Sequence, residues 1–220
     1  MRWRESVEKN AFPSSALDWI EREVNVKAQP EKLAAEYPRR MAEKARALPV
    51  GNPHTEQVAL GPIITAQQVA RVDRIVRESV AMGAKLLAGG TPNGPFYPAT
   101  VLAEVTPQMP VFREEIFGPV VSISAFSTDA QAVALANDSE YGLSAGVHTR
   151  DIGRGMKLAE QLHVGLVHVN DQTVNDDGTM PMGGRGASGN GSRHGGPANW
   201  DEFTQWQWMT VRNDAPAYPL

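Results

Sequence analysis

The sequence predicts an α/β fold in which a largely parallel sheet is flanked by helices. Short apolar runs alternate with amphipathic segments of helical spacing, in the order strand, helix, strand, helix, strand. Of the 220 residues, 41% are hydrophobic, and a chain of this length can bury roughly 70% of its unfolded surface. Both observations favour a protein with a substantial core.

The start of the chain differs from the rest in charge. The first 46 residues carry 10 Lys or Arg and 8 Asp or Glu, whereas the remaining 174 carry 11 and 17. Such a density of charge is typical of solvated helices. Pro38 should prevent a single helix through residues 31–47 and suits the first turn of a helix that ends at Ala47. We therefore predict a charged helical head over residues 1–47.

The clearest helix is predicted over residues 66–82, ending at Gly83. Its apolar face consists of residues spaced three and four apart: Val69, Val72, Ile75, Val76 and Val80. On the other face, two pairs of opposite charge are spaced four apart: Asp73 with Arg77, and Arg74 with Glu78.

Strands and helices alternate along the rest of the predicted domain, which spans residues 48–198. Strands are expected at residues 85–88, 99–105, 119–126, 144–149 and 165–170. Helices are expected at residues 129–137, capped by Thr128 or Asp129, and at residues 151–162, with Met156, Leu158 and Leu162 inward.

The chain ends in an aromatic-rich segment. Polar and apolar residues alternate over residues 202–212, which predicts a strand with Trp206 and Trp208 on one face. An uncovered strand of this kind tends to pair with another chain. Residues 199–220 are therefore predicted to be an oligomerisation strand and tail.

Composition excludes several kinds of site. There is no Cys, so we expect no disulfide, Cys-ligated zinc or thiol nucleophile. The five His show no metal-binding spacing, so no metal is expected. A net charge of −4 argues against nucleic acid, and no apolar run approaches the roughly 20 residues that span a bilayer. With no signal peptide expected, we predict a cytoplasmic protein.

Two further patterns resemble features of binding sites. Residues 184–189 match G-x-G-x-x-G, but they neither follow a predicted strand nor open a helix, so they are not expected to bind a dinucleotide. Asn170 and Asp171 end a predicted strand, where ligands of parallel sheets bind. Turn formation by these residue types explains them equally well.

Residues 114–119 are the segment that stands out on its chemistry. Glu114 and Glu115 precede an aromatic residue and a Gly-Pro turn, just ahead of an apolar strand. A carboxylate in such a turn can accept hydrogen bonds from two hydroxyl groups at once, as a ribose offers, and Phe117 can cover a flat ring. Such turns are common, and a role in folding alone gives the same pattern.

The run Glu115-Ile116-Phe117-Gly118-Pro119 resembles the E-x-F-G-P motif of NAD(P)-dependent aldehyde dehydrogenases. Asn52 replaces an Asp of the family's LPVGDP stretch, and Met182 replaces the Phe of its P-F-G-G. The residues that carry the resemblance lie between about 37 and 212, in the stretches 45–51, 60–64, 83–90, 96–102, 136–138, 141–145, 149–151 and 181–184. Residues 168–176, 186–189 and 191–193 resemble the benzaldehyde and vanillin dehydrogenase branch.

The resemblance implies the fold of the family's catalytic domain. In this family a Cys attacks the aldehyde, a hydride passes to NAD(P), and a Glu activates water. The position of that Cys falls around residues 17–24, which contain none, and the dinucleotide-binding domain is expected upstream. We therefore expect no catalytic residue here, no required cofactor, and at most weak or vestigial binding of NAD(P).

Other roles are carried over residue by residue from the resemblance. Glu115 should meet the hydroxyls of the nicotinamide ribose, and Phe117 should pack near the nicotinamide ring. The expected wall of the aldehyde pocket comprises Asn170, Asp171, Thr173 and Met182. Since the family's C-terminal strand crosses to a neighbouring subunit, we expect a homodimer whose interface includes Phe203, Trp206, Trp208, Met209 and Val211.

Three functions remain open. The first is a truncated aldehyde dehydrogenase-like protein without autonomous activity, acting as a dimerising or interaction module. The second is one half of a split NAD(P)-dependent aromatic aldehyde oxidoreductase, completed by another aldehyde dehydrogenase chain. The third is a single-chain dehydrogenase with an unusual mechanism.

Overall fold

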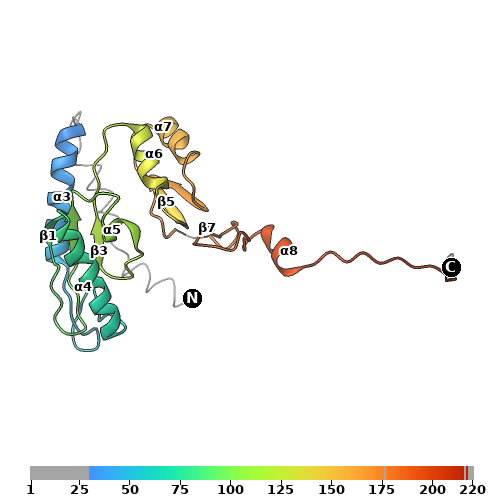
Figure 1. The fold of residues 1–220 in the computed structure, drawn as a ribbon, viewed down its shortest axis with the longest axis horizontal. Helices are drawn as coiled ribbons and strands as arrows, with labels where there is room; N and C mark the ends of the chain where they lie inside the picture. Colours follow the sequence, from blue (N-terminus) through green and yellow to red (C-terminus); the bar gives the residue numbers. More distant parts are fainter. Residues whose placement is uncertain (1–29, 176, 216, 218–220) are drawn as a thin grey trace. The chain divides into compact units, whose positions relative to one another are not determined.

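A computed structural model describes residues 30–175, 177–215 and 217, with side-chain burial known from Ala35 onward. The contacts between residues divide the chain into two units, with the boundary in the sequence between Ser127 and Thr128. Figure 1 shows the elements of both. The predicted boundary at residue 47 instead marks the end of a helix that belongs to unit 1. Residues 1–29, including the expected position of the family's Cys, lie outside the described residues.

Unit 1 has three layers. Its sheet has the order β1 (Lys85–Ala88), β2 (Thr100–Ala103) and β3 (Val120–Ser122). The helix α3 (Pro30–Ala47) packs on β1 and β2. Val101 joins the cluster that contains Ala42 of α3, whereas its neighbour Leu102 joins the cluster formed by α4 (Ala66–Ala81). Because successive side chains of a strand point to opposite faces, α3 and α4 cover opposite faces of the sheet.

The helix α4 forms where its spacing predicted it. The Thr65 hydroxyl accepts a hydrogen bond from the Gln68 amide at 3.1 Å and caps the helix. The prediction that Val80 faces inward was wrong, since its exposure is 38%. Ser79 occupies that buried position instead, where its hydroxyl accepts a hydrogen bond from the amide of Val111 in α5 (Pro110–Arg113) at 3.0 Å.

The helix α3 continues through Pro38, so the prediction that a new helix begins there was also wrong. A proline inside a helix loses one backbone hydrogen bond and crowds the preceding turn, at a cost of about 3 kcal/mol. Packing of the following turns offsets this cost. Ala42 is 2% exposed, and Arg46 donates a hydrogen bond to the carbonyl oxygen of Leu87 in β1.

Unit 2 contains two separate pairs of short strands. The strands β5 (Ser144–Val147) and β6 (Leu166–Val169) are parallel, and β4 (Tyr141–Gly142) pairs with β7 (Arg185–Gly186) in the antiparallel sense. The helix α7 (Ile152–Ala159) packs on β5 and β6. The remaining helices are α6 (Asp129–Asn137) and α8 (Ala198–Phe203).

Side-chain caps start both longer helices of unit 2. Thr128 caps α6 and Asp151 caps α7. The expectation that Met156 faces inward was wrong, since it is 51% exposed. Gly155 takes the buried position, because a Cβ there would lie 2.8 Å from Cγ1 of Val169. The helix approaches β6 through a residue without a side chain.

The α/β class is confirmed, but the sheets are mixed rather than largely parallel. The pairs β2–β3 and β5–β6 are parallel, whereas β1–β2 and β4–β7 are antiparallel. A parallel connection requires a crossover, usually through a helix. Residues 89–99, between β1 and β2, contain no helix, so these strands return in opposite directions.

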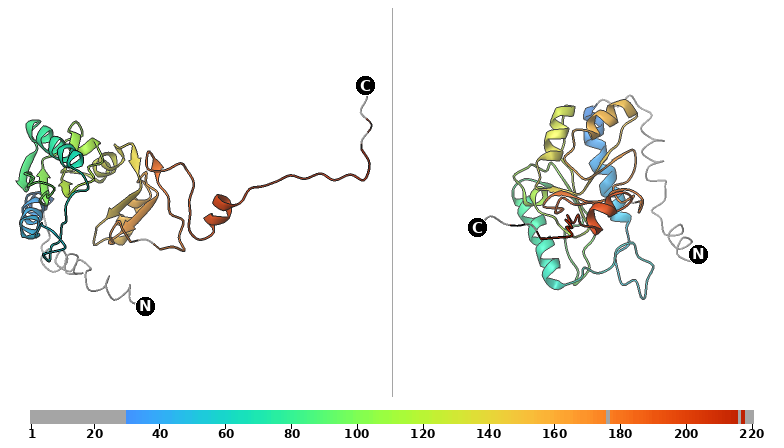
Figure 2. Two further views of the ribbon diagram at one scale, coloured as in Figure 1. Left: turned by 90° about the horizontal axis from the view of Figure 1, so that it is seen from below. Right: turned by 90° about the vertical axis from the view of Figure 1, so that its right-hand side faces the viewer.

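The end of the chain differs from the predicted strand. Residues 198–203 form α8, and residues 204–212 continue as an extended segment without strand pairing within the described residues (Figure 2). Trp206 and Trp208 are 104% and 92% exposed. An extended backbone becomes a strand only where a partner accepts its hydrogen bonds, so the homodimer remains a prediction. Within the described residues, no helix is long and apolar enough to cross a membrane.

Candidate functional site

The turn of residues 114–118 connects α5 to β3 and is held by side chains of α4. The Nε2 atom of Gln68 donates to the carbonyl oxygen of Ile116 at 2.8 Å and to that of Phe117 at 3.3 Å. Arg71 donates from Nη1 to the same Ile116 oxygen at 3.2 Å. These residues lie on one face of α4 because they are three apart in sequence.

Glu114 fastens the start of this turn to the same helix. Its Oε2 accepts a hydrogen bond from Nη2 of Arg71 at 3.2 Å and one from Nη2 of Arg74 at 2.9 Å. The bond to Glu114, and then the bond to Glu78, raise the pKa of Arg74 above its usual value. Glu114 therefore holds the turn in place, a role that the sequence patterns did not assign to it.

Glu115 and Phe117 are presented to solvent by this arrangement. Among the described residues, no group donates a hydrogen bond to the exposed carboxylate of Glu115 or forms an ion pair with it. Phe117 is 77% exposed and has a φ of 49°, in the left-handed region. Because residue 118 is a glycine, the backbone of the turn can lie close to α4. A Cβ at this position would lie 2.8 Å from Cγ2 of Val72. The turn thus offers a free carboxylate and an exposed ring.

A hollow of about 670 Å³ lies beside the Phe117 ring. One wall is the apolar segment that leads into α4, in which Ile64 is 91% exposed. The lining residues are Leu60, Gly61, Pro62, Ile63, Ile64, Thr65, Gln68, Phe117 and Pro119. An apolar hollow edged by an aromatic ring can hold a flat ring, and a carboxylate two residues away in the chain can accept hydrogen bonds from hydroxyl groups.

The predicted pocket-wall residues at the end of β6 have partners of their own. The Asn170 side chain accepts from the Thr149 amide at 2.7 Å and donates to the Thr149 carbonyl at 2.8 Å. Asp171 accepts from the Asn175 side chain at 2.6 Å and the Gln172 amide at 2.8 Å, and these bonds lower its pKa. Both residues therefore have structural roles: Asn170 ties the end of β6 to Thr149, which follows β5, and Asp171 forms a local turn.

The other two predicted pocket-wall residues lie in separate hydrogen-bonded segments. The carbonyl oxygen of Thr173 accepts from the hydroxyl of Ser144 in β5 at 3.0 Å. Met182 exchanges two backbone hydrogen bonds with His194 in the Gly-rich loop, at 2.7 and 3.0 Å. In that loop, Ser188 donates to the Arg185 carbonyl at 3.0 Å in a tight turn, and residues 184–189 open no helix.

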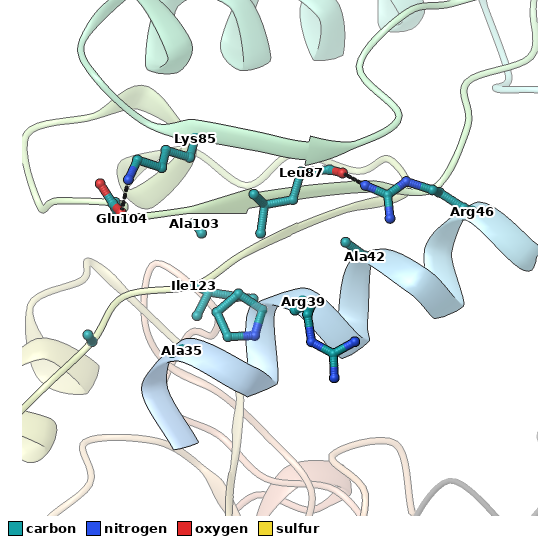
Figure 3. A pocket seen from close by; sticks show the side chains of 11 residues that line it. Ala35, Arg39, Ala42, Arg46, Lys85, Leu87, Ala103, Glu104 and Ile123 are labelled. Atoms are coloured by element: carbon teal, nitrogen blue, oxygen red, sulfur yellow. Dashed lines mark hydrogen bonds and ion pairs between the residues drawn. The ribbon is translucent and has the colours of Figure 1, made fainter. Parts of the chain in front are cut away.

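A smaller hollow of about 330 Å³ lies between α3 and the sheet of unit 1 (Figure 3). Ala42, Leu87 and Ile123 give it an apolar surface. Its charged groups already have partners: Lys85 pairs with Glu104, Arg46 donates to a backbone carbonyl, and Arg39 pairs with Glu43. This hollow therefore offers no free charge for a ligand. Within the described residues, no cluster of His, Asp or Glu could hold a metal ion.

Comparison with known proteins agrees with the resemblance of the sequence. A model described as "Aldehyde dehydrogenase family" matches residues 28–209. The chain is 51% identical over 189 residues to a vanillin dehydrogenase of Amycolatopsis sp. and 46% identical over 188 residues to a benzaldehyde dehydrogenase [NAD(+)] of Pseudomonas putida. Each alignment covers 86% of this chain and 39% of the relative, so the chain spans about two fifths of their length.

The chain also matches solved structures over about two fifths of their length. A salicylaldehyde dehydrogenase from Pseudomonas putida G7, complexed with salicylaldehyde, matches with a TM-score of 0.78 and 36% identity over 86% of this chain and 39% of that one. A Mycobacterium tuberculosis aldehyde dehydrogenase complexed with NAD+ matches with a TM-score of 0.68 and 35% identity, over 76% and 37% of the respective chains.

Proposed function

We propose, from the premise that this chain belongs to the aldehyde dehydrogenase family, that its 220 residues act as a dimerising module and not as a complete dehydrogenase. The module retains the turn that faces the nicotinamide half of NAD(P). The exposed extended segment after α8 carries the dimerising part of this proposal, and the geometry of Glu115 and Phe117 on their α4 support carries the nucleotide part. The lack of any Cys supports the view that these residues alone do not oxidise aldehydes.

The residues of the turn fit the nicotinamide ribose. The Glu115 carboxylate has no partner within the described residues and can accept hydrogen bonds from both ribose hydroxyls. The exposed Phe117 ring lines an apolar hollow and can pack against a flat ring. NAD(P), when bound, supplies the acceptor for hydride. What this chain contributes is the orientation of the ribose and the exclusion of water from one side of the ring.

Calorimetric titration of the full chain with NAD and NADP tests this assignment. We expect weak binding that Glu115→Gln weakens about five- to tenfold, because the amide replaces a charged acceptor. Glu56→Gln is the matched control, since it removes an exposed carboxylate from a different loop of unit 1. Equal affinities for the wild type and Glu115→Gln, or no heat at millimolar cofactor, would assign the turn to folding alone. Steady NADH production from benzaldehyde by the chain alone would contradict the absence of autonomous activity.

The dimer is proposed to form through the extended segment after α8, with a second copy of this chain as its partner. Phe203, Met209 and Val211 are 74%, 71% and 82% exposed, in addition to the two Trp residues. Two copies related by a two-fold axis present the same unpaired backbone to each other. One interface can therefore supply hydrogen-bond partners for the backbone groups of both copies. The alternation of residues 204–212 would then place Trp206 and Trp208 on one side of the new pair.

Sedimentation at micromolar concentration measures this association. We expect a dimer that becomes a monomer when residues 201–220 are deleted or when Trp206 and Trp208 are both changed to Ser. Trp200→Ser is the control, since Trp200 lies on α8 and is also 74% exposed. A wild-type monomer, or a dimer that persists after the deletion, would contradict the proposal.

Fractionation of the producing cells tests the cytoplasmic location that we retain from the sequence.

A second candidate function is supported by the unpartnered Glu115 carboxylate. A split aldehyde oxidoreductase would need another chain to supply the nucleophile and the dinucleotide-binding domain, while this chain supplies the turn. Aldehyde-dependent formation of NADH only on mixing with such a chain would support this function. Its loss with Glu115→Gln, but not with Glu56→Gln, would place the turn in the completed site.

A further inference from the structure

Phe117 has a backbone conformation that it would not adopt unaided. Its φ of 49° lies in the left-handed region, where a bulky side chain is an outlier. It is also 77% exposed, so packing of its ring within the described residues does not hold it there. Contacts of the neighbouring backbone must therefore maintain this conformation, and hydrogen bonds to that backbone are among them.

Gln68 makes the hydrogen bonds that can do this. One carbonyl that it contacts belongs to Ile116, whose peptide plane sets the φ angle of Phe117. The other belongs to Phe117 itself, whose plane sets ψ. A single amide nitrogen thus contacts both peptide groups that flank the Phe117 α-carbon.

The position of Gln68 in α4 makes this contact notable. Thr65 and Gln68 have the spacing of a capping box, in which the side chain of the third helical residue returns to the amide of the cap. The Thr65 half of that arrangement is present, with its hydroxyl accepting from the Gln68 amide at 3.1 Å. The Gln68 side chain instead reaches residues 48 and 49 positions further along the chain. The cap fixes its backbone, and the side chain is free to hold the turn.

We propose that Gln68 is a positioning residue, which locks Phe117 in the left-handed conformation and so presents Glu115 and Phe117 to the nucleotide before it binds. Arg71 supports the same carbonyl of Ile116 from the next turn of α4. A turn held in its binding conformation loses less entropy on association, so the affinity depends on this support. The ligand part of this inference rests on the function proposed above, whereas the conformational part does not.

The test compares Gln68→Glu with Gln67→Glu in the full chain. Glutamate keeps the shape of Gln68 and is compatible with the capping box, but its carboxylate has no hydrogens to donate. Gln67 is the adjacent, exposed residue of the same helical turn, so its substitution adds the same charge away from the turn. The HN–Hα coupling of Phe117 reports its φ by NMR and requires no nucleotide.

We expect Gln68→Glu to change the Phe117 coupling, to speed amide exchange at residues 116–118 about tenfold, and to weaken nucleotide binding at least about fivefold. Gln67→Glu should change none of these, and neither variant should alter the melting of α4. Gln68→Ala should reproduce the change in coupling and exclude an effect of added charge.

The outcomes separate this inference from the proposed function. An unchanged Phe117 coupling in Gln68→Glu and Gln68→Ala would overturn the positioning role, whatever the nucleotide does. A changed coupling without binding of NAD or NADP to the wild type would confirm the positioning role and overturn the nucleotide assignment. A changed coupling with unaltered affinity would overturn the claim that this conformation serves binding.

Discussion

The two units of the chain bury different parts of the polypeptide. In unit 1, large side chains such as Tyr97, Ile75 and Leu102 have 0% exposure and meet between a sheet and helices. In the described part of unit 2, the residues that are buried are all glycines: Gly142, Gly155, Gly184 and Gly195. Unit 1 is therefore organised by side-chain packing, and unit 2 by close approach of its backbone segments.

This difference bears on how each unit is stabilised. Burial of apolar area contributes about 25 cal/mol per Å², so fully enclosed side chains give unit 1 an internal source of stability. In unit 2, apolar residues such as Leu166 and Val167 remain half-buried, and Val174 and Met180 are 75% and 61% exposed. We expect unit 2 to gain stability when another surface covers these residues.

The largest expected effect separates the two units by their cores. Leu102→Ala in β2 should cost about 2–5 kcal/mol, because it leaves a cavity in an enclosed cluster. Leu166→Ala in β6 should cost less than about 2 kcal/mol, because that side chain is only half-buried. Residue-resolved hydrogen exchange measures both losses within their own units. Equal losses would show that unit 2 has a core comparable to that of unit 1.

A smaller effect is expected where unit 2 depends on backbone contact. A Cβ at Gly165 would lie 1.7 Å from the carbonyl oxygen of Gly183, so Gly165→Ala must displace backbone. We expect a loss of about 1–3 kcal/mol for unit 2, as for other overpacked sites. Gly178→Ala is the control, since nothing lies within 4 Å of a Cβ there. Similar urea midpoints for both variants would refute the view that close backbone approach stabilises this unit.

At alkaline pH the sensitive unit should be unit 1. Burial raises the pKa of Tyr97 to about 12, above its ordinary value of 10.0. The unfolded chain thus loses this proton first, and stability falls as the pH rises from about 10 to 12, by about 1 kcal/mol at pH 11. Tyr97→Phe should remove this dependence. Urea denaturation across this pH range, with tyrosinate absorbance, measures it, and an unchanged slope in Tyr97→Phe would contradict the assignment.

The smallest expected effect is a loss of stability of unit 2 at acid pH. A hydrogen bond from Arg154 lowers the pKa of Asp129, and hydrogen bonds from Thr179 lower that of Asp177. Because these pKa values are lower in the folded protein, their contribution is complete above the ordinary value and is lost as the pH falls through about 4 and below. Asp129→Asn should reduce the acid loss measured by urea denaturation, whereas Asp201→Asn on α8 should not.

The sequence was most informative where a structure depends on nearby residues, although the inward orientations expected for Val80 and Met156 were wrong. The cap at Thr128, the spacing of Val69, Val72 and Ile75, and the pair Arg77–Asp73 at 2.7 Å all involve residues within four positions. Local periodicity and capping follow from helix geometry, so they are visible without a fold.

Features that depend on distant contacts were not accessible in the same way. The resemblance assigned a role to Glu115 but none to Glu114, because Glu114 acts through Arg71 and Arg74, which lie 43 and 40 residues away. The position of Pro38 inside a helix depends on the packing of α3 against a sheet whose strands come later in the sequence, so the local pattern around Pro38 does not predict it. The one available signal for Gln68 was its capping-box spacing after Thr65, which predicts a different bond from the one observed.

The parallel pairing of β2 with β3 has a consequence for how the chain acquires its candidate site. Residues 104–119 form the crossover between these strands and contain the whole turn that carries Glu115 and Phe117. Closing such a loop costs chain entropy before any contact compensates it, so parallel pairs tend to form late in folding. During synthesis, α4 emerges before this crossover. A nascent chain that already has its helix therefore has no turn to present, and ligand binding would report completion of the β2–β3 pair rather than early collapse.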